Sequence, residues 1–354
     1  MSLAERTPDV RFGIVGAGFV ADFYMRALQN VRHQRVVAVV SRTGQRATDL
    51  VERYGEGVAL ESVDALVGRD DIDVIVVAVP QDAHLSVVRA AAAAGKGVIC
   101  TKPLGRDSEE AVECLRAVTE ANVWHGYAET AVFSPAVVRA KEVVDAGGIG
   151  RVLSVRAREA HGSPHAHARE AGRMGGGPLR GLGCHGVAVG RWFLEGARPV
   201  EVMAWGDRLD RDDVQVEDNA LMIVRFDDRR VVQVEACWTH VAGLDVRREI
   251  HGSNGWIGTN ETSETGVRAF AGNSAGYVME KAGSDRGWVT PVLDEPLTYG
   301  YQGGFDHFVK CLLAGITPRQ TLKDGVIDAA IIDAGYRSMG SRAWEPVVLP
   351  AGLD

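Results

Sequence analysis

Apolar residues in the first third of the chain fall into short continuous runs that alternate with amphipathic stretches. The runs are typical of strands buried on both faces and lie at residues 11–15, 36–40, 73–79, 98–100 and 124–127. Helical spacing predicts helices after the first strand, at residues 45–54, 62–67 and 82–94, and from residue 108. Strands that alternate with helices predict a doubly wound parallel sheet with right-handed connections.

The pattern changes after residue 150, where longer strands follow one another with few helices between them. We predict strands at residues 151–159, 200–205, 218–226, 230–238 and 247–251, and helices at 135–147, 305–313 and 324–338. This succession indicates an α+β domain with a mostly antiparallel sheet. The glycine-rich stretch 271–296 has no clear period, and we expect a loop there.

Two domains follow from this change of pattern. We place the first over residues 1–126 and the second over residues 127–354, and we expect the helix 324–338 to pack back on the first domain.

A glycine motif follows the first strand. The sequence Gly16-Ala-Gly-Phe-Val-Ala21 lies between this strand and a helix, within a strand–helix–strand unit of the expected length. Gly16 allows a tight turn and Gly18 lets the backbone approach a pyrophosphate, to which the helix N-terminus offers amide groups. The motif therefore predicts binding of a dinucleotide, against the alternative of a purely structural glycine turn.

The end of the second strand bears on the choice of dinucleotide. Ser41 and Arg42 stand where an NAD-binding fold often has an acidic residue for the ribose 2′-hydroxyl. A serine and an arginine tolerate or bind a 2′-phosphate, which favours NADP slightly. If Arg42 instead faces solvent or stacks on adenine, NAD remains acceptable.

Lys102 follows the strand at residues 98–100, in a turn that Pro103 keeps out of the sheet. A single lysine in a turn is usually a surface residue. However, ligands of doubly wound sheets bind beyond the carboxyl ends of the strands, where Lys102 and Glu129 both lie. We therefore expect Lys102 beside a bound nicotinamide.

Residues 160–185 are rich in histidine and arginine. A metal site is not expected, because first-row metals usually also draw on carboxylates or cysteines in a defined geometry. The alternatives are a flexible loop and, for His185, a buried histidine of the core. The basic side chains hint at an anionic group on the substrate. The candidate substrate-binding residues are His161, His165, His167, Arg169, Arg173 and, from a later helix, Tyr301.

Composition narrows the classes of partner. The 354 residues are 46% hydrophobic and 24% charged, with a net charge of −8, which argues against nucleic acid as a partner. The sequence contains no run of ~18 apolar residues of the kind that would predict a membrane span, and the polar N-terminal segment shows no signal peptide. Five scattered cysteines suit reduced thiols. We expect a cytoplasmic protein with a small-molecule substrate.

Taken together, the motifs resemble those of the Gfo/Idh/MocA family of NAD(P)-dependent oxidoreductases over essentially the whole chain. They are Gly16-Ala-Gly-Phe-Val-Ala21, Val77-Ala-Val-Pro-Gln-Asp-Ala-His84, Cys100-Thr-Lys-Pro-Leu104 and Gly175-Gly-Gly-Pro-Leu-Arg-Gly-Leu-Gly-Cys-His185. The resemblance implies a Rossmann domain followed by an open-faced, mostly antiparallel sheet that builds homodimers or homotetramers. It also implies a carbohydrate-like substrate: a sugar, sugar acid, inositol or dihydrodiol.

The resemblance also implies roles for two residues. Lys102 matches the family lysine that touches the nicotinamide ribose and the reacting hydroxyl, with Thr101 in place of the usual glutamate. His185 matches the family histidine, but the two acids that usually flank it are replaced by Gly181 and Ala188. Glu129 is an acid that takes over part of their role in one interpretation, and is a solvated or ribose-binding carboxylate in the other.

We therefore take Lys102, His185 and Glu129 as candidate catalytic residues. The candidate residues for binding NAD or NADP are Gly16, Gly18, Phe19, Val20, Ser41, Arg42, Val79, Pro80, Gln81, His84, Thr101, Lys102 and Glu129.

Three functions are compatible with these residues. The first is hydride transfer between a nicotinamide and a secondary alcohol of a sugar, sugar acid, inositol or glycoside, with Lys102 on the alcohol oxygen and His185 taking the proton. The second is a redox-neutral, NAD-dependent glycoside hydrolase that oxidises, eliminates, hydrates and reduces again. The altered set of acids motivates this alternative. The third is a dinucleotide-binding sensor without catalysis.

Overall fold

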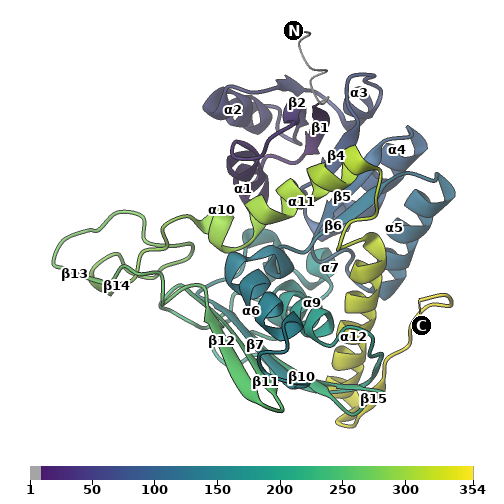
Figure 1. Cartoon of the computed structure of the whole chain (residues 1–354). Coiled ribbons are helices and arrows are strands. Elements are labelled where there is room, and N and C mark those ends of the chain that lie inside the picture. The colour runs from purple at the N-terminus through teal and green to yellow at the C-terminus, as the bar shows by residue number, and fades with distance from the viewer. Residues whose placement is uncertain (1–8, 354) are drawn as a thin grey trace, which may run out of the picture.

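Two β-sheets, each with its own helices, divide the chain (Figure 1). The computed structural model describes residues 9–353. The N-terminal segment on which we based the prediction of no signal peptide lies almost wholly outside these residues. None of the helices described is long and apolar enough to cross a membrane.

The first sheet is parallel throughout and has the order β3-β2-β1-β4-β5-β6. Its strands are β1 (Val10–Val15), β2 (Gln34–Val40), β3 (Val58–Leu60), β4 (Val74–Val77), β5 (Gly97–Thr101) and β6 (His125–Ala128). The predicted Rossmann-like sheet is thereby confirmed. The sequence pattern missed only β3, because this three-residue edge strand is mostly exposed and has no long apolar run.

Helices cover both faces of this sheet. They are α1 (Phe19–Leu28), α2 (Gln45–Tyr54), α3 (Val63–Val67), α4 (His84–Ala93, after the 3₁₀ turn Gln81–Ala83), α5 (Ser108–Glu120) and, from the end of the chain, α11 (Tyr301–Ala314). Ser62 caps α3 as expected, since its hydroxyl accepts from the backbone N–H of Ala65 at 3.1 Å. Helix α5 begins at Ser108 as expected, and Asp107 caps it, since its carboxylate accepts from the backbone N–H of Glu110 at 2.8 Å.

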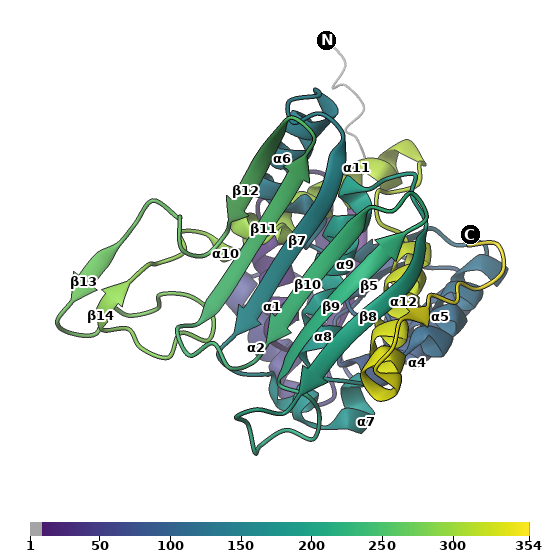
Figure 2. The same ribbon diagram turned by 90° about the horizontal axis from the view of Figure 1, so that it is seen from below.

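The second sheet has the order β12-β11-β7-β10-β9-β8-β15 and is antiparallel except for the pair β7–β10. Its strands are β7 (Val152–His161), β8 (Pro199–Asp207), β9 (Asn219–Phe226), β10 (Val231–Cys237), β11 (Leu244–Gly252), β12 (Gly255–Asn260) and β15 (Glu345–Pro346). The helices α6 (Pro135–Asp145), α9 (Gly183–Phe193) and α12 (Leu322–Ser341) pack on one face. The other face is open (Figure 2).

Helix α12 contacts both halves of the molecule. It packs along β8 and also against α5, where Asp333 accepts from the backbone N–H of Ser108 at 2.8 Å. The same carboxylate pairs at 2.5 Å with the buried guanidinium of Arg180, in the short helix α8 (Pro178–Gly181). Helix α12 therefore connects α5 of the first half to α8, which precedes α9.

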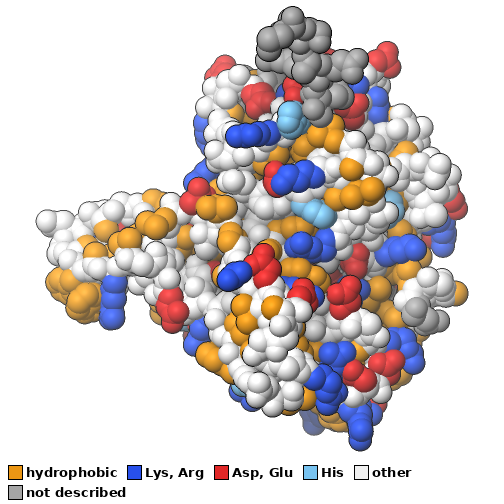
Figure 3. Space-filling model, in the orientation of Figure 1, with side chains coloured by type: hydrophobic (Ala, Val, Ile, Leu, Met, Phe, Trp, Pro, Cys, Tyr) orange, Lys and Arg blue, Asp and Glu red, His pale blue; other side chains and the backbone are white. Residues whose placement is uncertain are grey.

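The stretch expected to be a loop at residues 271–296 carries some regular structure. It holds the strand β14 (Gly287–Val289), which pairs with β13 (Ala269–Ala271), and the first half of the short helix α10 (Glu295–Thr298). We call residues 263–294 the arm. Figures 1 and 3 show it projecting from the body with hydrophobic side chains on its surface. Strands of three residues are too short to leave a clear period in the sequence.

Candidate active site

Gly16 lies where the first loop crosses the middle of the parallel sheet. Its φ is +116°, and a Cβ there would stand 2.1 Å from the carbonyl oxygen of Ala78. Its N–H donates to the carbonyl of Val40 at 2.8 Å. Both conformation and space thus demand glycine, and the chain can turn directly from β1 into α1.

Gly18 forms an open cradle at the N-terminus of α1. No side chain caps this helix, and a Cβ on Gly18 would meet nothing within 4 Å. Beside it is a hollow of about 390 Å³, lined by Phe19, Arg46 and Arg53 among others. The hydroxyl of Ser41, at the end of β2, is buried without a partner among the described residues. Free helix amides next to an open space fit the pyrophosphate of a dinucleotide.

The loop after β4 supplies the next predicted cofactor contacts, and Val79, Pro80 and Gln81 line this edge after the strand ends. His84 is wholly buried, and its ring nitrogens lie 3.0 Å from the carbonyl of Leu104 and 2.9 Å from that of Val79. Because both nitrogens face backbone carbonyls, this side chain supports the two loops that border the cradle.

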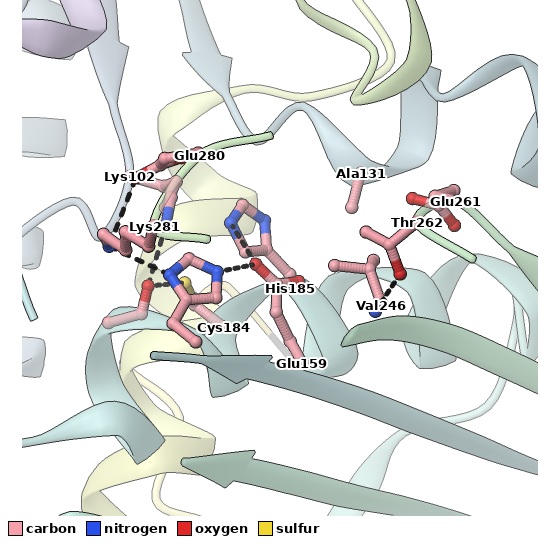
Figure 4. Close-up of polar contacts among 12 residues, drawn as sticks. Lys102, Ala131, Glu159, Cys184, His185, Val246, Glu261, Thr262, Glu280 and Lys281 are labelled. Carbon is pink, nitrogen blue, oxygen red and sulfur yellow. Dashed lines mark hydrogen bonds and ion pairs between the residues drawn. The ribbon is translucent and has the colours of Figure 1, made fainter. Parts of the chain in front are cut away.

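Lys102 lies past the end of β5, as expected, and reaches towards the second half of the molecule. Its amine donates to the carbonyl oxygen of Gly181 at 2.8 Å (Figure 4). Thr101, which replaces the glutamate usual in the family, is buried and accepts from the hydroxyl of Tyr24 at 2.8 Å. Lys102 is therefore held by α8 on one side and by the first sheet on the other.

His185 in α9 lies against Glu129, which follows β6. Its Nδ1 forms a hydrogen bond with Oε1 of Glu129, and this oxygen also accepts from the N–H of Ala131 at 3.0 Å. The carboxylate is fully buried and the imidazole almost so. A carboxylate on Nδ1 favours the tautomer that carries its proton there and leaves Nε2 as the basic nitrogen. Glu129 thus contacts His185, the residue whose usual flanking acids are replaced by Gly181 and Ala188.

Gly181 and Ala188, the two positions that lack acids, offer His185 no carboxylate, so its acid partner comes from another element. A Cβ on Gly181 would stand 1.9 Å from the Cε of Met174, so a larger residue fits only if Met174 moves. Ala188 is buried in the core against which α9 packs. Packing at both places suits small residues, and His185 takes its carboxylate from elsewhere.

Glu159, near the end of β7, is a second carboxylate at His185 that the sequence analysis missed. Its Oε1 lies 3.5 Å from Nε2 of His185 and 3.5 Å from Nε2 of His161. Its Oε2 lies 3.2 Å from the buried guanidinium of Arg248. Burial alone would raise the pKa of Glu159, but these cationic neighbours lower it well below its usual range. A signal existed: Val155, Ala157 and Glu159 alternate on the inward face of the strand, so an acid there is buried.

The histidine-rich segment splits between the site and its border. His161 ends β7 inside the site, whereas His165 packs against Phe19 of the cradle, with ring centroids 5.3 Å apart and ring planes tilted by 43°, and stacks on His167. The segment therefore spans from the glycine loop to His185. Tyr301 at the start of α11 packs on Phe23 and Tyr24, with ring centroids 5.1 and 5.8 Å apart.

The two candidate arginines of this segment are engaged with acids. Arg173 pairs with Asp82 at 2.9 Å, and Arg169 lies 3.4 Å from Asp213. Asp213 also pairs with Arg211 at 2.8 Å, so Arg169 shares its acid with a second arginine, and the expectation of an anionic group on the substrate stays a prediction.

Glu129, Cys184 and His185 place three potential metal-binding atoms within 4.8 Å of one another. The carboxylate and the imidazole, however, already bond each other, and burial raises the pKa of the Cys184 thiol far above its usual range. A thiol that keeps its proton is a poor metal ligand. We interpret the group as a hydrogen-bonded cluster, and the expectation of no metal stays a prediction.

The site combines a parallel sheet that carries a glycine cradle, a lysine just past β5 and a buried histidine–carboxylate pair. This combination is typical of nicotinamide-dependent oxidoreductases. Residues 10–128 match the sequence model of an oxidoreductase family with an NAD-binding Rossmann fold, and residues 137–258 match that of the GFO/IDH/MocA C-terminal domain. The chain belongs to the Gfo/Idh/MocA family.

Relatives match over nearly the full chain. An inositol 2-dehydrogenase of Rhizobium meliloti is 26% identical, covering 94% of this chain and 98% of its own. A levoglucosan dehydrogenase of Pseudarthrobacter phenanthrenivorans is 25% identical, covering 96% and 98%. Among solved structures, GenD2 from gentamicin A biosynthesis in complex with NAD superposes with a TM-score of 0.89 at 26% identity, covering 96% and 97%. A levoglucosan dehydrogenase with NADH and levoglucosan superposes with a TM-score of 0.80 at 26% identity, covering 96% and 99%.

The segment over the site should lose stability in acid. Burial, and then the charge of Lys281, lower the pKa of His161, and burial and Arg173 lower that of His167 to about 4. An unfolded histidine titrates near ~6.5, so the unfolded chain binds more protons below that pH, and stability falls as the pH drops through it.

We expect the thermal midpoint of unfolding to be lower at pH 5.5 than at pH 7.5. The decrease should be smaller in His167→Gln than in the wild type. Calorimetry of both proteins at the two pH values measures this difference, with His33→Gln, a change in the loop before β2, as the control. An equal loss in wild type and His167→Gln would contradict the assignment.

Proposed function

We propose that this protein oxidises a secondary alcohol of a sugar or polyol with a nicotinamide dinucleotide, and catalyses the reverse reduction. The observation that carries the proposal is the convergence of Lys102, His185 and Glu129 at the carboxyl edge of the parallel sheet, next to the Gly16–Gly18 cradle. Relatives that act on inositol and levoglucosan support the substrate class.

Lys102, His185 and Glu129 have separate roles in this reaction. A dinucleotide held at the Gly16–Gly18 cradle would supply the acceptor for the hydride that leaves the carbinol carbon. Lys102 donates a hydrogen bond to the alcohol oxygen and stabilises the negative charge that develops there. His185 takes the hydroxyl proton on Nε2, while Glu129 holds its tautomer and stabilises the imidazolium. The balance is alcohol plus oxidised dinucleotide giving ketone, reduced dinucleotide and one proton.

Replacing Lys102 tests this assignment. In Lys102→Ala we expect kcat to fall ~100-fold or more, as for the loss of one transition-state donor, while the dinucleotide still binds. Stopped-flow absorbance of the nicotinamide on a panel of inositols, sugars and anhydrosugars measures turnover, and fluorescence titration measures binding. Lys310→Ala, at an exposed lysine of α11, is the matched control. Near-normal turnover in Lys102→Ala would overturn the role.

A redox-neutral glycosidase is the second candidate. It needs an additional base for the proton next to the transient ketone, and the second carboxylate at His185, Glu159, favours it. The same panel, extended to glycosides, separates the two functions. Release of an aglycone with solvent deuterium in the sugar and no net change in nicotinamide absorbance identifies the glycosidase, whereas stoichiometric reduction of the dinucleotide identifies the dehydrogenase. Binding without any turnover would indicate a sensor.

We propose that the cofactor site accepts NADP as well as NAD. Arg42 is exposed just past β2, beside the buried hydroxyl of Ser41. An arginine there can pair with a 2′-phosphate, and a charge-assisted hydrogen bond contributes ~1.5–3 kcal/mol. In Arg42→Glu we expect the Kd of NADPH to rise tenfold or more and that of NADH to change little. Arg139→Glu, at an exposed arginine of α6, is the control, and an unchanged ratio of the two Kd values would contradict the proposal.

We also propose that the protein forms a homodimer through the open face of the second sheet. In one alternative, two such dimers assemble into a homotetramer. Trp205, Leu221 and Ile223 are 39–47% exposed on β8 and β9, and Trp256 on β12 is 56% exposed. Trp205 and Leu221 are partners across β8 and β9, and apolar side chains exposed on a sheet face are typical of an interface.

Charge placed on this face should separate the subunits. In the double variant Trp205→Glu, Ile223→Glu we expect a monomer at micromolar concentration, because an isologous interface brings each carboxylate against its symmetry mate or an apolar partner. Sedimentation velocity measures the mass. Ile316→Glu, at an exposed site after α11, is the control. An unchanged dimer would place the interface elsewhere.

A further inference from the structure

Lys281, in the arm, brings a second amine into the candidate active site. Its Nζ lies 3.0 Å from Nδ1 of His161 and 3.2 Å from Oε1 of Glu280, and its side chain is 11% exposed. Its φ of +55° lies in the left-handed region, which a residue with a Cβ adopts at a cost in conformational energy. A Cβ on Gly162 would stand 3.0 Å from the carbonyl oxygen of Lys281, so the arm packs closely on the end of β7.

A continuous line of polar groups runs from this amine to His185 (Figure 4). Lys281 contacts Nδ1 of His161, and Nε2 of His161 faces Oε1 of Glu159 at 3.5 Å. The same oxygen faces Nε2 of His185 at 3.5 Å. This is the nitrogen that the bond to Glu129 leaves free. Glu159 therefore lies directly at the basic atom of the proposed proton acceptor.

We infer that Glu159, His161 and Lys281 act together as positioning residues that set the basicity of His185. Glu159 supplies the negative charge that stabilises the imidazolium, in place of the acids replaced by Gly181 and Ala188. Lys281 donates to Nδ1 of His161 and so fixes the tautomer whose Nε2–H points at Glu159. The inference rests on the proposed function, in which His185 takes a proton.

Charged groups from several elements face this line. His185 faces Glu129 and Glu159, with Cys184 beside it, and Glu159 also faces His161 and Arg248. Arg248 in turn pairs with Glu261 at 3.2 Å. Lys281 faces His161 and Glu280, and Lys102 is near enough to disfavour its charge. Glu280 also lies 3.7 Å from His165. The acids alternate with imidazoles and basic groups along this line, so removing a charged member acts on the basicity of His185 with a defined sign.

Two variants should move the pH profile of alcohol oxidation in opposite directions. Glu159→Gln removes a negative charge from His185, so we expect the acid limb of kcat/KM to move to lower pH by roughly one unit and kcat to fall about tenfold or more. Lys281→Met removes a positive charge, so we expect the acid limb to move to higher pH. Substrate KM should change less than kcat, because neither group is placed on the substrate.

Controls separate charge from packing. Lys281→Arg keeps the charge and should keep a profile close to that of the wild type, and Lys310→Met tests the same exchange on the surface. Lys281→Gly removes the amine and also relieves the left-handed backbone, so it should unfold at a higher temperature than Lys281→Met yet share its profile. Profiles that stay fixed, or that move in the same direction for Glu159→Gln and Lys281→Met, would overturn the inference.

A measurement without turnover distinguishes this inference from the proposed function. In ¹⁵N-histidine NMR of the wild-type protein at neutral pH, we expect His161 to show a protonated Nε2 and a bare Nδ1. Lys281→Met should convert this signal to a mixture of tautomers, whereas Lys310→Met should not. If His161 carries its proton on Nδ1 in the wild type, the inference is wrong whatever the activity. If the tautomers behave as expected but no alcohol is oxidised, the proposed function fails instead.

Discussion

The buried pair of Glu129 and His185 is the interaction on which the site depends, because it joins the two sheets at one hydrogen bond. Glu129 follows β6 of the first sheet, and His185 lies in α9, which covers the second. A fully buried carboxylate is costly unless it is bonded, and this one uses the imidazole and the N–H of Ala131. The bond of Lys102 to Gly181 crosses the same boundary. The sheets must therefore keep their relative position for the three groups to stay together.

Local patterns explain why much of this was predictable from the sequence. The turn at Gly16 requires a positive φ and the absence of a Cβ, and few sequences other than a glycine motif between a strand and a helix satisfy both. The ends of parallel strands share an edge, so Lys102 and Glu129 were placed near each other without knowledge of any side-chain contact. Both inferences use backbone geometry that neighbouring residues determine.

The remaining part of the site depends on contacts between distant segments. Glu159 and Arg248 meet because β7 and β11 pair in one register, and a shift of either strand by one residue would place the two side chains on opposite faces of the sheet. Lys281 comes from the arm, whose three-residue strands leave no period to read. Its reach into the site is a property of the packed loop, to which Gly162 contributes by its lack of a side chain. No local rule connects residue 281 with residue 161.

Acids are thus exchanged between elements while the charge around the histidine is kept. Small residues at 181 and 188 let α8 and α9 pack closely, and Gly181 then offers its carbonyl to Lys102. The two carboxylates at His185 come instead from the loop after β6 and from β7, and they face opposite nitrogens of the ring. Since a proton acceptor responds to nearby charge whichever element carries it, this arrangement can preserve the chemistry of the family with a different set of residues. The imidazole thereby lies between two acids, Glu129 and Glu159, with the guanidinium of Arg248 behind the second.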